Sequence, residues 1–232
     1  MNVLAIVPAT LWREGRETAV LASIDDKPLL GHLLDRLSRV SKLEGIVVTT
    51  SDDPRDAPIR DYCDARKTIC QRGPCDDLLG RLIAVLKAAG ATGGVMVDAG
   101  NPLIDLELVD KVVNLLQMTD GMLDWIGNTL SPTYPRGMEI DGFTTAALEE
   151  SEKRCMEPEQ RRQGPAFLRQ NSRLYRPLSL TAPPGLDRLD MKLNVEGPED
   201  VPRIAAILRR FKDQPDYGLG DLFHFLETEP PV

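Results

Sequence analysis

The first half of the chain alternates short, continuous apolar runs with longer amphipathic segments. Residues 3–7, 46–50 and 94–97 are apolar runs of strand length, typical of strands buried on both faces of a sheet. In residues 28–37 and 78–86 the leucines recur at helical spacing. Strands and helices that alternate in this rhythm predict an α/β fold with a mostly parallel, doubly wound sheet flanked by helices.

The second half of the chain is less regular and carries shorter patterns. Residues 124–126 predict a strand, residues 144–154 a helix, and residues 192–195 a final strand that leads into a last long helix. In doubly wound sheets, ligands bind at the carboxyl ends of the strands. The polar residues that follow each strand are therefore the first candidates for a functional site.

The chain divides into one large domain and a short tail. We expect a single α/β domain over residues 1–212, with a small inserted lobe at about residues 130–190. The remaining residues, 213–232, contain several prolines and predict a peripheral tail with a short helix at residues 222–226.

The composition excludes several classes of partner. Acidic residues outnumber basic ones by 36 to 28, for a formal net charge of −8, so the surface should repel a nucleic-acid polymer. No apolar run approaches the roughly 20 residues of a membrane span, and no signal-peptide pattern opens the sequence. We therefore expect no membrane partner and a cytoplasmic location. With only two histidines, a metal would be a hard ion held by carboxylates, and Mg²⁺ is the first choice.

The long loop after the first strand, residues 8–25, is the first candidate site. Its cations are Arg13 and Arg16, and Lys27 follows at the start of the next helix, where free backbone N–H groups also attract anions. The loop lacks the glycine-rich fingerprints of common phosphate-binding motifs. A solvated surface loop with ordinary charges is the alternative interpretation.

Carboxylates and amides follow two other predicted strands. Asp98 ends the strand at residues 94–97 with Asn101 just beyond it, and Glu196 ends the strand at residues 192–195. If these strands are neighbours, the two carboxylates form a pair suited to Mg²⁺. A single aspartate at such a place is as often a helix or turn cap.

A third candidate is the segment around Arg136, which lies between a proline and a glycine. A stiff backbone there can present the guanidinium to a carboxylate or a phosphate. Asn128 and Glu139 add polar groups to the same segment. A purely structural turn is the alternative.

Six segments, in this order, resemble the cytidylyltransferase family typified by the spore-coat polysaccharide biosynthesis F-type proteins, relatives of the synthetases that make CMP-activated acid sugars. The resemblance covers about residues 3–211. The segments are KPLL (27–30), IVVTTSDDP (46–54), DDLLGRL (76–82), NPLID (101–105), NTLSPTYPRGMEI (128–140) and NVEGPED (194–200).

The resemblance implies a nucleotide-diphospho-sugar-transferase-like fold and a defined reaction. A sugar oxygen attacks the α-phosphate of CTP and pyrophosphate leaves, with Mg²⁺ as cofactor and CTP and a sugar, expected to be acidic, as partners. Relatives commonly dimerise through the inserted lobe, so a homodimer is an expectation. The roles fall on the candidates named above: Arg13 and Arg16 for catalysis, Asp98 and Glu196 for the metal, and, for substrate binding, Lys27, Asn101, Asn128, Arg136 and Glu139.

Several positions depart from the pattern of this family. Its members carry a lysine where this chain has Ala19, and an aspartate where it has Gly100. Asp98 lies two residues before that position, about 6.5 Å away along a strand. Glu196 replaces a late aspartate, and Gln163 stands where a histidine is usual.

Two hypotheses therefore remain open from the sequence. The protein is a cytidylyltransferase of surface-polysaccharide or acid-sugar biosynthesis that works through shifted residues. Alternatively, it is a catalytically impaired member of the family that acts as a sugar- or nucleotide-binding or scaffold protein.

Overall fold

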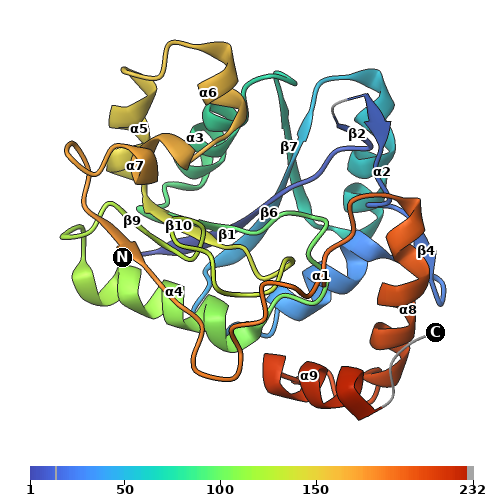
Figure 1. Cartoon of the computed structure of the whole chain (residues 1–232). Helices are drawn as coiled ribbons and strands as arrows, with labels where there is room; N and C mark the ends of the chain where they lie inside the picture. Colours follow the sequence, from blue (N-terminus) through green and yellow to red (C-terminus); the bar gives the residue numbers. More distant parts are fainter. Residues whose placement is uncertain (14, 229–232) are drawn as a thin grey trace.

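The computed structural model describes residues 1–13 and 15–228, and a seven-stranded sheet forms its centre (Figure 1). From one edge to the other, the strands are β11 (Pro177–Ser179), β9 (Trp125–Gly127), β10 (Asp141–Thr144), β8 (Gly93–Met96), β1 (Val3–Pro8), β6 (Gly45–Ser51) and β7 (Ile69–Gly73). Only β10 runs antiparallel to its neighbours, β8 and β9. The prediction of a mostly parallel α/β sheet is confirmed.

Helices cover both faces of the sheet, and alternate residues of β1 point to opposite layers. Val3, Ala5 and Val7 pack with the layer that contains α1 (Leu29–Leu37), α4 (Leu106–Thr119), α8 (Val201–Arg210) and α9 (Leu219–Thr228). Leu4 and Ile6 pack with the layer of α3 (Leu78–Ala89), α5 (Thr145–Glu152) and α7 (Ala166–Gln170). This two-residue alternation is the normal geometry of a strand buried on both sides, and it places the helices above and below the sheet in Figure 1.

Residues 130–190 supply both strands and helices. They contribute β10 and β11 to the central sheet, and α5 and α6 (Pro158–Arg162) pack against α3. The strand expected at residues 192–195 is not formed: within the described chain only a single bridge joins Lys192 to Arg136. Instead, the backbone there bonds to two loops, through Leu193 N to Arg136 O and Val195 N to Gly100 O.

The C-terminal segment is part of the hydrophobic core, not a peripheral tail. Helix α9 buries four apolar side chains, among them Leu222 and Phe223, in the same cluster as α1 and α4. Asp105 explains the attachment, because one carboxylate oxygen caps α4 at Leu108 N and the other accepts a hydrogen bond from Leu219 N at 2.6 Å. Within residues 1–13 and 15–228, no helix has the length and apolar character needed to cross a membrane.

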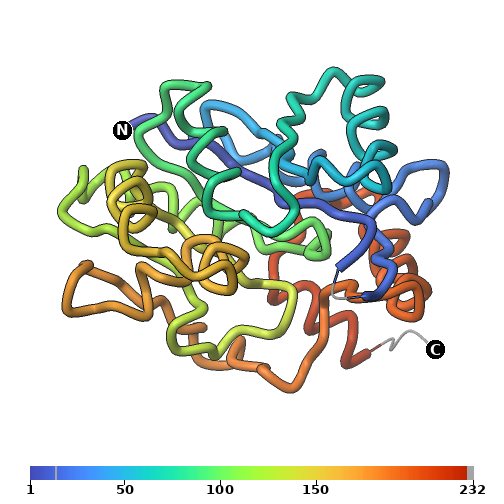
Figure 2. Tube along the Cα trace, turned by 90° about the horizontal axis from the view of Figure 1, so that it is seen from above, coloured from blue at the N-terminus to red at the C-terminus, as the bar shows by residue number. Residues whose placement is uncertain are grey.

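The loop after β1 folds into two small hairpins. The first joins β2 (Trp12–Arg13) to β3 (Arg16–Glu17), and the second joins β4 (Ser23–Ile24) to β5 (Lys27–Pro28). A short 3-10 helix, η1 (Pro54–Asp56), precedes α2 (Ala57–Arg66) beside this loop. In the view from above, the dark blue first hairpin lies next to the orange segment that leads to α8 (Figure 2).

Candidate functional site

Two cavities open next to each other at the carboxyl ends of the parallel strands. The wide cavity, of about 850 Å³, lies between the β2–β3 hairpin, the loop after β8, and residues 136–139 and 194–199. The narrow cavity, of about 500 Å³, lies between the same hairpin, the ends of β1 and β6, and helices α3 and α6. Arg13 and Asp98 line both cavities. This is the edge at which the topology of an α/β sheet places ligands.

One buried carboxylate, that of Asp56, holds the base of the β2–β3 hairpin in place. Its Oδ1 accepts a hydrogen bond from Leu11 N at 2.6 Å. Its Oδ2 accepts hydrogen bonds from Thr10 Oγ1 at 3.0 Å and from Ser51 Oγ at 2.5 Å. Asp56 is only 1% exposed, so these bonds form away from water and fix the hairpin where β1 ends.

An exposed ion pair separates the two cavities. Arg13 Nη2 donates to Asp98 Oδ2 at 2.8 Å, while Asp98 Oδ1 accepts a hydrogen bond from Gly100 N at 2.8 Å. The two side chains are 48% and 37% exposed, and ion pairs in such surroundings contribute little to stability. A phosphate arriving here can therefore replace Asp98 as the partner of Arg13 at small cost.

Arg136 lines the wide cavity from a backbone that is fixed on both sides. Its N–H donates to Met191 O at 3.0 Å, and its carbonyl accepts a hydrogen bond from Leu193 N at 2.7 Å. Gly137 has φ +100°, and a Cβ on it would lie 2.6 Å from the Leu193 carbonyl carbon. Only glycine fits this close approach, which fixes the backbone of the arginine at the cavity that Arg16 also lines.

Glu139 is held at the wide cavity by two donors. Its Oε2 accepts hydrogen bonds from Gly137 N at 2.8 Å and from Asn101 Nδ2 at 3.3 Å. Enclosure by the surrounding protein raises the pKa of Glu139, and the nearby charge of Asp98 acts in the same direction. The site thus contains a positioned carboxylate that binds a proton more tightly than an ordinary glutamate.

Asp98 and Glu196, the residues predicted from the sequence to hold a metal ion, both line the wide cavity. Glu196 accepts hydrogen bonds from Asn194 Nδ2 and Lys192 Nζ, each at 3.2 Å, and these donors lower the pKa of Glu196. In the described part of the chain, no three ligating side chains converge on one point. Mg²⁺ is commonly held by one or two carboxylates, with phosphate oxygens and water completing its shell, so the metal role of these two residues stays a prediction.

Packing closes the two positions at which the family carries a charge that this chain lacks. A Cβ on Gly100 would lie 2.6 Å from Val195 O, so an aspartate there requires the backbone to move. Ala19 is 5% exposed and belongs to the hydrophobic core, so a lysine there would have to displace packed neighbours. Arg13 and Arg16 are consequently the cations that this loop presents to a ligand.

Seven of the nine residues predicted from the sequence line the wide cavity; they are Arg13, Arg16, Asp98, Asn101, Arg136, Glu139 and Glu196. The structure places the other two elsewhere. Lys27 donates to Asp35 of α1 at 2.5 Å and faces a different cavity. Asn128 is buried, donating to Met138 O at 2.6 Å and accepting from Ile140 N at 3.0 Å, so its amide joins backbone segments and is not open to substrate.

Arg81 is a candidate that the sequence reasoning did not identify. It lies on α3, lines the narrow cavity and is 9% exposed, yet its buried Nε and Nη1 have no hydrogen-bond partner among the described residues. Burial lowers the pKa of Arg81. The available signal was a cation between Leu79 and Leu82 on the buried face of an otherwise apolar helix. Buried donors without a partner are costly, which makes Arg81 a candidate for contact with a ligand.

The chain has sequence relatives along its whole length and shares its fold with solved structures. The chain is 22% identical to the spore coat polysaccharide biosynthesis protein SpsF of Bacillus subtilis, over 99% of this chain and 95% of that protein. A solved cytidylyltransferase structure from Leptospira borgpetersenii superposes with a TM-score of 0.89 at 21% identity, covering 99% of this chain and 94% of that one. At this identity, the structural likeness establishes the fold.

A CMP:2-keto-3-deoxy-manno-octonic acid synthetase, solved in complex with CTP, also has this fold. It superposes with a TM-score of 0.66 at 14% identity, covering 90% of this chain and 99% of that one. The sequence profile of the family described as Cytidylyltransferase matches residues 4–126, which is more than half of the chain. The protein belongs to the cytidylyltransferase family.

Proposed function

We propose that the protein transfers CMP from CTP to an acidic sugar for a surface polysaccharide. The observation that carries the proposal is the sharing of Arg13 and Asp98 by two adjoining cavities. A nucleotide in one cavity and a sugar in the other would meet at these residues. That is the arrangement a transfer between two substrates needs, since both must be held in contact during the reaction.

The narrow cavity is the better fit for the nucleotide. Arg81 offers it two buried donors that lack partners, matching the acceptor atoms of a pyrimidine base or a phosphate. Trp12 is 41% exposed at the same cavity. The guanidinium of Arg55 lies over its ring, 5.3 Å from the centroid, and the exposed part of the ring would stack on a base. A base near Arg81 would place the phosphates toward Arg13, at the border of the wide cavity.

The wide cavity is the better fit for the sugar. Asn101, Glu139 and Asn194 supply the donors and acceptors that sugar hydroxyls require. Arg136 makes no ion pair among the described residues, so its guanidinium is available to a carboxylate in a bidentate arrangement. An acidic sugar would supply that carboxylate.

The chemical step breaks one P–O bond and forms another. The sugar oxygen attacks the α-phosphorus, the bond from that phosphorus to the bridging oxygen breaks, and pyrophosphate leaves with the electron pair. Arg13 and Arg16 would neutralise the charge that develops on the phosphates. Glu139 is our candidate for the group that accepts the hydroxyl proton, because its pKa is raised and its carboxylate is positioned. Asp98 and Glu196 would hold Mg²⁺, whose charge would offset that of the triphosphate.

A direct assay tests the proposal. The protein is mixed with CTP, Mg²⁺ and a set of acidic and neutral sugars, and ³¹P NMR follows CTP, pyrophosphate and the CMP-sugar. We expect transfer with CTP but not UTP, and with an acidic sugar. The Arg13→Ala variant should lose the transfer, whereas Arg60→Ala, which removes an exposed arginine paired with Asp64 on α2, should keep it.

Calorimetry with CTP and Mg²⁺ separates this proposal from the impaired alternative. If millimolar CTP does not bind, the nucleotide site assigned here is wrong. If CTP binds but no sugar of either class is converted, the binding or scaffold role is supported. The latter outcome would fit the packing that leaves no room for a side chain at position 100.

A further inference from the structure

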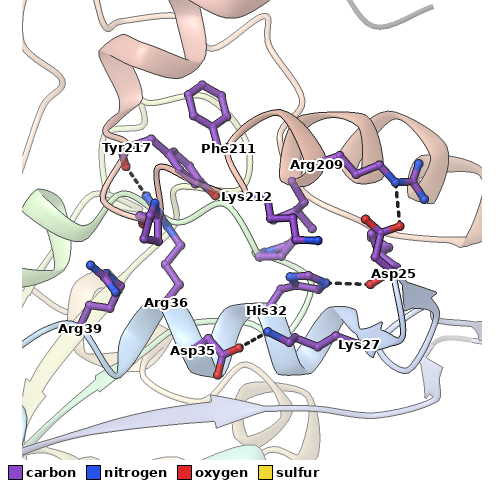
Figure 3. Close-up of a pocket in the computed structure, with 14 residues that line it drawn as sticks. Asp25, Lys27, His32, Asp35, Arg36, Arg39, Arg209, Phe211, Lys212 and Tyr217 are labelled. Atoms are coloured by element: carbon purple, nitrogen blue, oxygen red, sulfur yellow. Dashed lines mark hydrogen bonds and ion pairs between the residues drawn. The ribbon is translucent and has the colours of Figure 1, made fainter.

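A third cavity lies away from the candidate site, between α1 and the chain that links α8 to α9 (Figure 3). This C-terminal cavity has a volume of about 250 Å³ and is lined by residues that include Ile24, Pro102, Leu208, Phe211 and Tyr217. An apolar cavity of about 150 Å³ can hold a benzene molecule. The C-terminal cavity therefore has room for a single-ring molecule but not for a nucleotide.

Positive charge at this cavity is only partly neutralised. Three of its cations have carboxylate partners: Lys27 pairs with Asp35, Arg39 with Asp216 and Arg209 with Asp25. The dashed lines in Figure 3 show the pairs of Lys27 and Arg209. Arg36 and Lys212 differ from these three.

Arg36 is a buried cation that makes no direct ion pair among the described residues. It is 5% exposed, and its guanidinium donates to three backbone carbonyls, those of Ile104, Pro215 and Tyr217. These bonds satisfy its donors, but no carboxylate of the described residues forms an ion pair with it. Asp105 and Asp216 offset part of its charge from a distance, without direct contact. The rest acts in a region of low dielectric, which favours an anion nearby.

Two further groups at the cavity lack partners in the described part of the chain. The ammonium group of Lys212 makes no ion pair or hydrogen bond there, although it lines the cavity. The hydroxyl of Tyr217 is buried without a hydrogen-bond partner, in a side chain that is only 7% exposed. In Figure 3 the Tyr217 ring extends among the lining residues, and its face stacks 3.7 Å from the Arg36 guanidinium carbon.

We propose that the C-terminal cavity binds a small aromatic carboxylate. The ring would pack against Leu208, Phe211 and Ile24, and the carboxylate would lie near the ammonium group of Lys212 and the guanidinium of Arg36. The partly apolar lining favours a carboxylate attached to a ring over a free inorganic anion. This site is separate from the transfer site and requires neither CTP nor a sugar.

An NMR titration of the full chain tests the site with benzoate as the probe and benzamide as its neutral analogue. Saturable shifts should appear at the amides of His32, Phe211 and Lys212, which line the cavity. Benzamide should bind about three- to tenfold more weakly than benzoate, because it lacks the charge. Phosphate alone should bind more weakly than benzoate.

Matched variants decide whether the cavity is responsible. Lys212→Ala should weaken benzoate binding about three- to tenfold while changing benzamide binding little. Lys153→Ala, which removes an exposed lysine at the end of α5, should change neither. Leu208→Trp should fill the cavity and abolish both.

Three results would overturn the proposal: equal affinity for benzoate and benzamide, shifts confined to residues outside the cavity, or unchanged benzoate binding in both Lys212→Ala and Leu208→Trp. Thermal unfolding of each variant shows that the native fold is present during the titration. Because no nucleotide is involved, failure here leaves the proposed transfer reaction intact.

Discussion

Two buried arginines on opposite layers of the sheet have different surroundings. Arg36 of α1 donates to three backbone carbonyls that belong to the loop before α4 and to the chain before α9. Arg81 of α3 is almost as buried, but its Nε and Nη1 have no partner within the described residues. Both arginines line cavities, but the donors of Arg36 join parts of the fold, whereas two donors of Arg81 are open.

Whether a buried charged group has hydrogen-bond partners separates a structural role from a functional one. A buried polar group without a partner destabilises the fold, so a site that keeps one gains something other than stability. The Asp56 carboxylate resembles Arg36, since Thr10, Leu11 and Ser51 surround it with donors. Replacing a buried charge that has partners should therefore reduce stability, whereas replacing one without partners should reduce binding.

The largest effect is expected at Arg36. Arg36→Ala removes three hydrogen bonds and leaves buried carbonyls unpaired, so the free energy of unfolding should fall by about 3–5 kcal/mol. Urea unfolding followed by circular dichroism measures it. Arg39→Ala is the matched control, because Arg39 follows the same helix and forms only an exposed pair with Asp216; its effect should be much smaller. Similar losses in both variants would remove the structural role assigned to Arg36.

The second effect is expected at Arg81, and it should appear in binding more than in stability. Arg81→Met keeps the apolar stem and removes unpaired donors, so the free energy of unfolding should change by less than about 1 kcal/mol. CTP affinity in calorimetry should fall about tenfold or more. Lys87→Met, on the exposed end of the same helix, should leave CTP affinity unchanged. A large loss of stability without a change in CTP affinity would mean that Arg81 has a structural role, like Arg36.

The sequence predicted the fold because the evidence for it is local. Continuous apolar runs such as residues 3–7 mark strands covered on both faces, and leucine spacing marks the helices that cover them. The same logic placed Asp98 at the edge of the sheet where ligands bind. Arg136, predicted as a separate candidate from its proline and glycine neighbours, lines the same cavity.

The failures of the sequence reasoning concern partners that are distant in the chain. The prolines at the C-terminus indicated a peripheral tail, but Asp105 binds the start of α9 from more than a hundred residues away. Lys27 comes directly after a turn with positive φ at Asp25 and Asp26, and the hairpin turns it toward Asp35. The side chain of Asn128 bonds to backbone atoms, and no sequence pattern indicates whether an asparagine bonds to the backbone or to a ligand. Arg81 was overlooked because its neighbours are apolar, although that setting is what makes it unusual.

The smallest effect is expected at Glu139, which accepts hydrogen bonds from Gly137 and Asn101 and also lines the wide cavity. Since enclosure raises the pKa of Glu139, the folded protein holds this proton more tightly than the unfolded chain does. Stability is therefore lost as the pH rises from the ordinary pKa of a glutamate to the raised one, and the loss persists at neutral pH. Glu139→Gln removes this penalty and should stabilise the protein at pH 7 by a few tenths of a kcal/mol, about 0.3, because the cavity is open to water.

The pH dependence distinguishes this mechanism from a general effect of removing charge. In unfolding experiments from about pH 4 to pH 7, the gain from Glu139→Gln should shrink toward the acid end. Glu196→Gln should show the opposite sign, because Asn194 and Lys192 lower the pKa of Glu196 and so stabilise its charged form above the ordinary pKa. Equal signs for the two variants would contradict the assignment. If Glu139 also accepts the substrate proton, the Glu139→Gln variant should be more stable and less active. This pattern is expected where a functional site keeps a charge that lowers stability.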